Sequence, residues 1–246
     1  MTPYTPSSPT RIRRAPARVA VLGGALFAVL FVVAHLVQPE VDPSWQPPSE
    51  LALGTAGWVM IAAFLALGIG CAALCVVLAN QVTTWPGRIG VIAVAIAAVG
   101  CLIGGAFTAD PVTTPPGEAT LTGAIHSLGP VLLDGIPVAA VLLAISLPRH
   151  SAHWRRARPV LIAGAACTVG AALLLTVSMG VFMSETGQLG PDVPIGWQGR
   201  FLLLAVAAWV VTVAGLALSI HRRARAGAAG AAEVSARSTL ATGASR

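Results

Sequence analysis

The fold is decided by long stretches without charged residues, and residues 51–79 are a clear example: LALGTAGWVMIAAFLALGIGCAALCVVLA. A helix needs about 20 predominantly apolar residues to cross the hydrocarbon core of a bilayer. Residues 51–79 exceed that length and contain no Asp, Glu, Lys or Arg. They are therefore predicted to form a membrane-spanning helix that has the bilayer as its main solvent.

Five further predominantly apolar stretches of spanning length occur along the chain, at about residues 18–37, 88–107, 122–147, 159–183 and 197–220. The composition agrees, since 10% of the residues are charged, against roughly 25% in a soluble domain. We predict an all-α integral membrane bundle of six transmembrane helices over residues 18–220. Residues 1–17 and the basic, then Ala/Gly/Ser-rich residues 221–246 are predicted to be disordered tails.

The first predicted span resembles a secretory signal peptide, because four arginines precede its apolar run. That run is longer than the roughly 7–15 apolar residues of a signal peptide, so we predict a retained helix. Small residues at helix-packing spacing, such as Gly100 and Gly104, favour a compact bundle. A dimer interface is the alternative, and the sequence leaves the oligomeric state open.

The distribution of arginine predicts the orientation. All 15 basic residues are Arg, and every one except Arg200 lies in a tail or loop that six alternating spans place on one side. Basic residues favour the cytoplasmic side, so both termini are predicted to be cytoplasmic. The net charge of +6 is divided among these short connections, and we therefore do not predict nucleic-acid binding.

Two acids near the predicted outer face are candidate binding residues. Glu50 follows Ser49 at the start of the second span. The alternative interpretation is local, with Ser49 as an N-cap and Glu50 favourable to the helix dipole. Asp110 ends the third span, where an acid opposes the dipole and benefits from a cationic or hydrogen-bonding partner. Its alternative role is that of a solvated turn residue.

Three further ionisable residues lie within the predicted spans. His126 is about one turn inside the fourth span, and Asp134 is two turns deeper on the same helical stripe. An acid at that depth costs about 3 kcal/mol on insertion scales, so Asp134 is expected to face the interior. It is either protonated and hydrogen-bonded or part of a proton path from His126. His126 as a packing residue, and His35 as an added member of this cluster, remain open.

Arg200 is the single arginine on the predicted outer side. Because it departs from the positive-inside pattern, we expect another group to hold it in place. Pairing with Glu50 or Asp110 is the hypothesis. These positions also carry a family resemblance, in residues 48–60 (PSELALGTAGWVM) with Phe64, in residues 104–111 (GGAFTADP) with Ile125 and His126, and in residues 199–201 (GRF).

The segments quoted above resemble a bacterial membrane family, domain of unknown function 998, over about residues 19–220. The resemblance implies a six-helix protein of the bacterial plasma membrane, with Glu50, Asp110, His126 and Arg200 as its characteristic polar positions. It implies no activity. The chain departs from the family pattern before Asp110, where a proline is expected. Asp134 and His35 match no family motif and stay secondary candidates.

Several functions remain open from the sequence. The preferred hypothesis is a lipid or small amphiphile bound at the outer polar cluster, with the acids meeting a cationic group and Arg200 a phosphate. The alternatives are a proton-coupled transporter, a membrane-embedded hydrolase using His126 and Asp110, and a haem protein with His35 and His126 as ligands. No nucleotide-binding loop or Cys/His zinc spacing is present. We predict no metal and no cofactor, expect membrane lipids as partners, and leave protein partners and enzymatic activity open.

Overall fold

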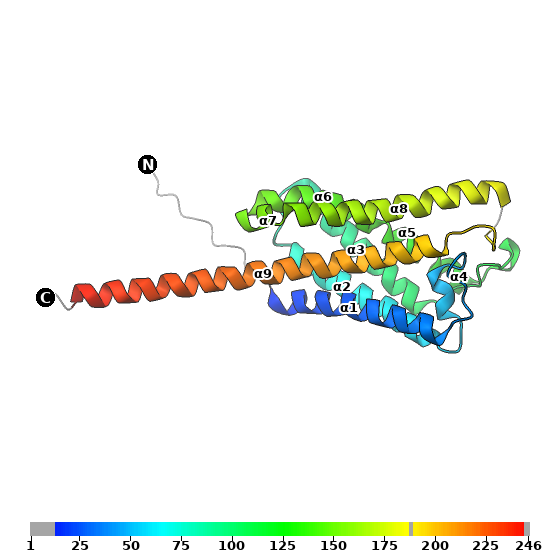
Figure 1. The fold of residues 1–246 in the computed structure, drawn as a ribbon, viewed down its shortest axis with the longest axis horizontal. Helices are drawn as coiled ribbons and strands as arrows, with labels where there is room; N and C mark the ends of the chain where they lie inside the picture. The colour runs from blue at the N-terminus through cyan, green and yellow to red at the C-terminus, as the bar shows by residue number, and fades with distance from the viewer. Residues whose placement is uncertain (1–12, 187–188, 244–246) are drawn as a thin grey trace.

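The computed structural model describes residues 13–186 and 189–243 (Figure 1). Its long helices are α1 (Arg14–Val37), α2 (Gly57–Leu78), α3 (Trp85–Ala106), α8 (Arg158–Thr186) and α9 (Gly196–Gly243). The short helices are α4 (Leu121–His126), α5 (Leu128–Leu133), α6 (Gly135–His150) and α7 (Ala152–Arg156). Two 3-10 turns, η1 (Pro48–Ala52) and η2 (Pro116–Glu118), lie in connections at one end of the bundle.

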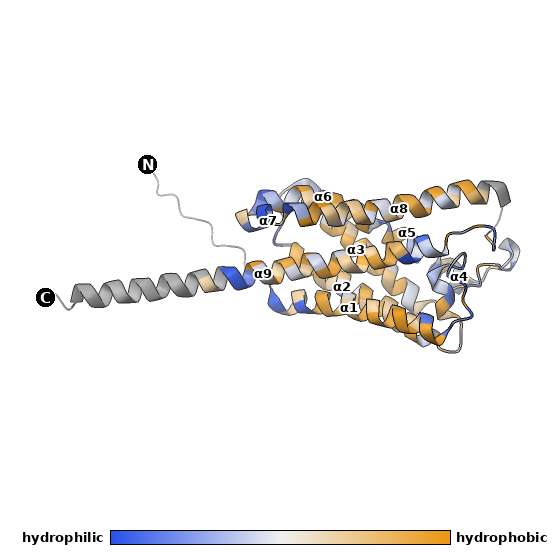
Figure 2. Ribbon diagram, in the orientation of Figure 1, coloured by the Kyte–Doolittle hydropathy of each residue, from blue (hydrophilic) through white to orange (hydrophobic). Residues whose placement is uncertain are grey.

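Six helical segments of the described chain are long and apolar enough to cross a membrane, with α4, α5 and α6 together forming the fourth. This confirms the predicted all-α bundle of six spans. Figure 2 shows apolar residues along the length of the bundle and polar residues near its ends. The predicted start of the second span at Leu51 is wrong, because residues 48–52 form the separate turn η1 and α2 begins at Gly57.

The six spans pack in chain order around a closed ring. Each contacts the next along the chain, and α9 returns to contact α1. The contact between α1 and α2 is close because glycines face each other: a Cβ on Gly23 would lie 2.8 Å from the Cα of Gly70. Small residues of this kind let transmembrane helices approach closely in lipid.

The fourth span is interrupted at Ser127 and Asp134, although we expected one continuous helix over 122–147. Pro130 and Pro137 explain the breaks. Proline has no N–H group and cannot donate to the carbonyl four residues earlier. The regular hydrogen-bond ladder is therefore lost near each proline, and the span consists of three helices in series.

The structure also differs from expectation at the chain ends. Helix α9 continues to Gly243, whereas we predicted a disordered tail over residues 221–246. The added residues are rich in Ala and Arg, both strong helix formers. Helix α1 begins at Arg14, inside the predicted N-terminal tail. The rest of that tail, residues 1–12, lies outside the described residues.

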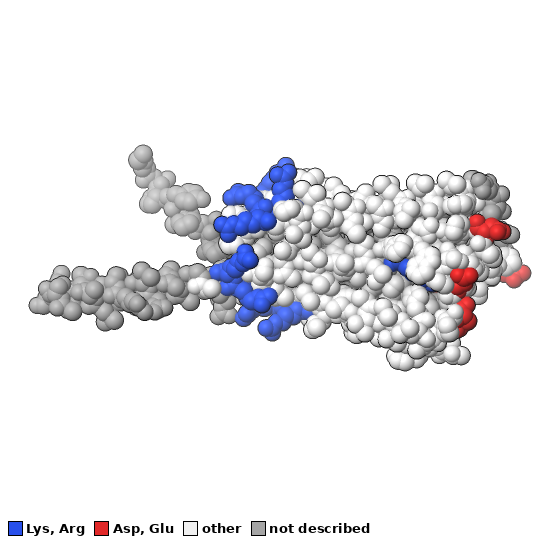
Figure 3. Space-filling view, viewed as in Figure 1, with Lys and Arg blue, Asp and Glu red and all other residues white. Residues whose placement is uncertain are grey.

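Charge divides the bundle into two ends (Figure 3). The basic end carries the arginines that flank the spans. Among the described residues they are Arg13, Arg14, Arg18, Arg88, Arg149, Arg155, Arg156, Arg158, Arg222 and Arg223. The acidic end carries the acids of the opposite connections. Among the described residues they are Glu40, Asp42, Glu50, Asp110, Glu118 and Asp192.

The contact between α3 and α5 provides a test of the packing. A Cβ on Gly100 would lie 2.6 Å from the backbone oxygen of Gly129, so Gly100→Ala must push the two helices apart. We expect a loss of about 1–3 kcal/mol of stability, measured as a lower thermal unfolding midpoint in detergent. Gly104→Ala is the control, because its Cβ would make only ordinary contact with Phe64 at 3.7 Å. Equal losses in both variants would contradict this account.

Candidate functional site

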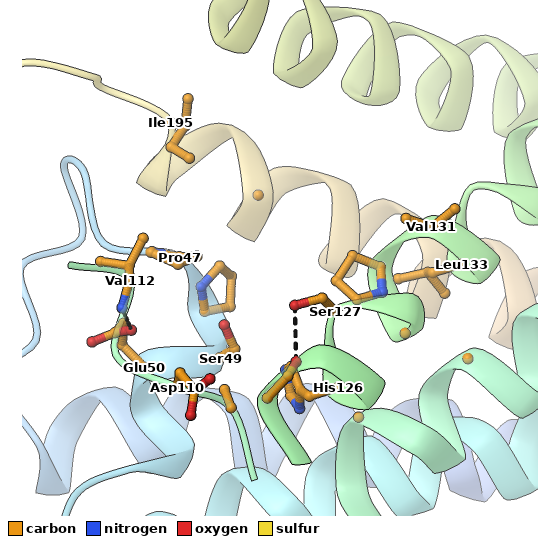
Figure 4. Close-up of a pocket in the computed structure, with 18 of the residues that line it drawn as sticks. Pro47, Ser49, Glu50, Asp110, Val112, His126, Ser127, Val131, Leu133 and Ile195 are labelled. Carbon is orange, nitrogen blue, oxygen red and sulfur yellow. Dashed lines mark hydrogen bonds between the residues drawn. The ribbon is translucent and has the colours of Figure 1, made fainter. Parts of the chain in front are cut away.

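A cavity of about 600 Å³ lies toward the acidic end, between η1, α3, α4, α5, α8 and α9. This volume is within the roughly 300–1,000 Å³ of small-molecule sites. Four of the predicted candidate residues line it: Glu50, Asp110, His126 and Asp134. Figure 4 shows Glu50, Asp110 and His126 grouped together, with Val131 and Leu133 farther along the cavity.

Glu50 is nearly buried, at 8% exposure, and joins two connections of the chain. Its Oε1 accepts a hydrogen bond from the Val112 backbone N–H at 2.8 Å, and its Oε2 accepts one from Gln46 Nε2 at 3.4 Å. Burial raises the pKa of the Glu50 carboxyl, and the two hydrogen bonds partly oppose that rise. The N-cap interpretation for Ser49 is wrong, since η1 is capped by Pro47 without a side-chain hydrogen bond.

Asp110 is fixed by the start of α4. Its Oδ2 accepts a hydrogen bond from the Thr120 backbone N–H at 2.8 Å, and its Oδ1 accepts one from the Thr120 hydroxyl at 2.7 Å. The same hydroxyl caps α4 by accepting from the Gly123 N–H at 3.0 Å. Thr120 is therefore the hydrogen-bonding partner that an acid after the end of α3 was expected to need.

Gly123 is a site residue that the sequence analysis missed. A Cβ at this position would collide with the Asp110 carboxylate, so the absence of a side chain is what lets Asp110 lie against α4. The available signal was its spacing from Thr120, because an N-cap threonine bonds the N–H three residues later. Nothing in that spacing indicates that an acid from another connection occupies the space.

His126 has one ring nitrogen in use. Its Nδ1 lies 2.8 Å from the carbonyl oxygen of Phe107, and a carbonyl can only accept, so Nδ1 carries the proton. The ring also packs edge-on against Phe64, with centroids 6.4 Å apart. Among the described residues Nε2 has no hydrogen-bond partner. The imidazole is thus anchored at Nδ1 and retains Nε2 for a ligand.

Asp134 lies deeper, at the junction of α5 and α6, where it lines the cavity. The residue is exposed and not enclosed, so the expectation that it faces the bundle interior is met only in part. Within the described part of the chain its carboxyl has no hydrogen bond and no ion pair. It does not bond His126, so the two predicted members of a proton path share a cavity without direct contact. An acid at this depth that meets no protein partner is free to meet a bound molecule.

Arg200 lies outside the cavity wall and does not pair with Glu50 or Asp110 in the described structure, contrary to our hypothesis. Its Nε donates to His35 Nε2 at 2.7 Å, and its Nη1 donates to the backbone oxygens of Gln46 and Gly196 at 2.6 and 2.9 Å. The guanidinium is 2% exposed, so it acts as an internal cross-link between α9, α1 and the α1–η1 loop.

His35 belongs to the Arg200 cross-link and not to the cavity. Arginine can only donate, so His35 Nε2 must accept and its proton must sit on Nδ1. That Nδ1 donates to the Phe31 carbonyl at 2.7 Å. Because both ring nitrogens are occupied, His35 does not fit the role of a haem ligand.

The hydrolase alternative also lacks its expected geometry. That alternative uses His126 and Asp110 together, whereas the His126 Nδ1 bonds the Phe107 carbonyl and both Asp110 oxygens bond Thr120, so no hydrogen bond joins the two side chains in the described structure. The described residues contain no group of three or more His, Cys, Asp or Glu side chains placed to hold a metal ion.

The ionisable side chains on the cavity wall are mainly acidic. Three carboxyl groups face it, from Glu50, Asp110 and Asp134, and no Lys or Arg is among its described lining residues. None of these acids forms an ion pair within the described ranges. Apart from these carboxyl groups, the His126 imidazole and a few hydroxyls, the wall is mainly apolar, with Phe64 and Leu202 among its members.

The amino-acid sequence matches a known protein family. The model of the family described as "Protein of unknown function (DUF998)" matches residues 21–216, which is most of the chain and includes all four candidate positions of the predicted cluster. The chain is a DUF998 protein. Neither the search of the curated proteins nor that of the solved structures found a match. Together with the six spans, family membership makes this DUF998 chain a multi-pass integral membrane protein.

The Arg200 cross-link can be tested by removing its donors. Arg200→Ala leaves His35 and two backbone oxygens without their hydrogen bonds, and we expect a loss of about 3 kcal/mol or more. The stability of Arg200→Lys should lie between those of the wild type and Arg200→Ala. A lysine keeps the positive charge, but its single ammonium group cannot reach His35 and Gln46 together as the planar guanidinium does. Thermal unfolding in detergent measures both. Arg223→Ala, at an exposed position of the basic end, is the control, and a matching midpoint for Arg200→Ala would refute the cross-link.

Glu50 should give stability a specific pH dependence. Its pKa is 4.5 in the unfolded chain and higher in the folded protein. Between these values the folded state binds the proton more tightly, so the contribution of Glu50 to the free energy of unfolding falls as pH rises. We expect the unfolding midpoint of the wild type, relative to Glu50→Gln, to decrease as the pH rises through 4.5 and then through the higher pKa of the folded state.

The window of Glu50 is separate from that of Asp42. Hydrogen bonds from Ser44 lower the pKa of Asp42 below 3.8, so its stabilising contribution is lost only under more acidic conditions. A difference between wild type and Glu50→Gln that stays constant across the window would contradict the burial of the Glu50 carboxyl.

Proposed function

We propose that this DUF998 protein binds a lipid or small amphiphile with a cationic head group in the cavity at its acidic end. The observation that carries the proposal is the set of three cavity-facing carboxyl groups without a basic partner among the described residues. A cationic ligand would supply the missing charge. Electrostatic attraction is stronger in such a site than in water, because the surroundings have a low dielectric constant.

Glu50 and Asp110 are suited to bind a head group although each already accepts two hydrogen bonds. An ionised carboxylate offers about four acceptor positions, so both keep capacity for an ammonium group. Their existing bonds hold the oxygens in place. His126 adds an acceptor at Nε2 when its proton is on Nδ1. Arg200 is not placed to bind a phosphate of the ligand, contrary to expectation, because its guanidinium bonds His35, Gln46 and Gly196.

The apolar part of the ligand would occupy the deeper part of the cavity. Leucine and methionine side chains from α8 and α9 are among the residues that line the cavity: Leu175, Met179, Leu202 and Leu203. A hydrocarbon chain gains free energy by leaving water for such a wall, at about 0.8 kcal/mol per buried methylene. The two parts of the cavity thus match the two parts of an amphiphile.

The proposal includes a location and an orientation. The basic end would face the cytoplasm of a bacterial cell, because positively charged residues are retained on that side. The acidic end and its cavity would then lie near the outer face of the plasma membrane. Both termini would be cytoplasmic, consistent with an even number of spans.

Proton-coupled transport is the second candidate function. The interrupted fourth span, with Asp134 at one break, favours it, because broken helices form the binding sites of many carriers. Such carriers commonly pair two interrupted spans, whereas α1, α2, α3, α8 and α9 are continuous over their described lengths. For this reason amphiphile binding remains the preferred function.

Three probes with the same chain and different head groups test the proposal: dodecylamine, dodecanol and dodecanoate. We would measure their binding by calorimetry to the full chain in phosphatidylcholine nanodiscs and subtract the signal of empty nanodiscs. The amine should bind about tenfold more tightly than the alcohol, and the carboxylate most weakly. Asp110→Asn should reduce amine affinity about tenfold.

Asp192→Asn is the matched control, because Asp192 is an exposed acid of the same end that does not line the cavity. Equal affinity for the three probes, or equal losses in Asp110→Asn and Asp192→Asn, would overturn the proposed function.

A further inference from the structure

A second hollow lies on the side of the bundle, between α6 and α8. It is a groove of about 490 Å³ whose wall is almost entirely apolar. Val138 and Val141 contribute to it from α6, and Leu173 contributes from α8. All three are exposed side chains within segments that span the membrane. In a bilayer, the medium beside this groove is therefore hydrocarbon.

The groove and the cavity share two residues. Asp134 and Thr176 line both, so their side chains stand at the junction between the lipid-facing groove and the interior. Asp134 has no hydrogen-bond partner within the described ranges. The junction is thus the one place where the apolar groove offers polar groups to a head group that moves inward.

Helix α8 is the wall of this junction with the least protein support. Only 17% of the apolar part of α8 is buried inside the protein, against 44% for the fourth span, which contains α6. A Cβ on Gly170 or Gly180 of α8 would meet nothing within 4 Å. Few side chains of α8 are therefore enclosed by the rest of the described protein, and this makes the α6–α8 side the best-suited place for a molecule to pass between two helices.

We propose that the ligand of the cavity is a bilayer-resident amphiphile that reaches it sideways between α6 and α8, past Asp134 and Thr176. This inference rests on the proposed function and adds the source of the ligand. The head group would exchange hydrogen bonds with Asp134 and Thr176 before it reaches Asp110 and Glu50. The chain would follow through the groove while it stays in contact with apolar surface.

The test measures exchange between membrane and cavity. Full-length protein in phosphatidylcholine nanodiscs is loaded with deuterated dodecylamine and mixed with an excess of unlabelled probe, and native mass spectrometry follows the loss of the deuterated mass. Leu173→Trp fills the groove without touching the cavity wall and should slow exchange about tenfold. Val138→Trp, from the opposite wall, should have the same effect and provides a second variant if the first folds poorly.

Two controls separate the possible routes. Val177→Trp places the same bulk at an exposed position of α8 outside both hollows, and it should exchange at the wild-type rate. Thr114→Trp places it on the cavity wall at the acidic end. Slow exchange in Thr114→Trp, with wild-type rates in Leu173→Trp and Val138→Trp, would overturn the lateral route while amphiphile binding stands. A wild type that retains no dodecylamine would overturn the proposed function, and the lateral route with it.

Discussion

A buried guanidinium holds the acidic end of the protein together. Arg200 connects α9 to His35 of α1 and to the backbone of Gln46. The Gln46 side chain in turn reaches Glu50, which holds the N–H of Val112 in the connection after α3. Hydrogen bonds that involve charged groups are strong when shielded from water, and leaving a buried partner unsatisfied is costly. The rim of the cavity is therefore held in place by a chain of hydrogen bonds that starts at Arg200, outside the cavity.

The sequence predicted the six spans because the length of an apolar stretch is a local property. It failed where local context competes with that length. Leu51 belongs to a 3-10 turn although it opens an apolar stretch, and Pro130 and Pro137 divide a span that hydropathy treats as continuous. The end of α9 could not be placed by hydropathy, since the helix continues beyond the apolar residues.

The candidate site was predictable only in part, and the reason is topological. Glu50, Asp110 and His126 were identified because ionisable residues are rare near a membrane interior, and all three line one cavity. The predicted partners of Arg200 were wrong because α9 packs against α1 and closes the ring. Chain order does not reveal that contact. Gly123 was missed because its importance lies in space that Asp110 occupies.

Because so little of α8 is buried by the protein, its position would depend on the surrounding membrane as well as on its neighbouring helices. One flank of this helix meets α6 and α9, and many of its other side chains are exposed on the side of the bundle, where a bilayer would place acyl chains. Contacts with those chains would then support α8 on the side that the protein leaves uncovered, as a neighbouring domain would in a soluble protein. The affinity of the site would in this way become a property of membrane composition, and a cell that remodels its lipids would retune the protein without altering its sequence.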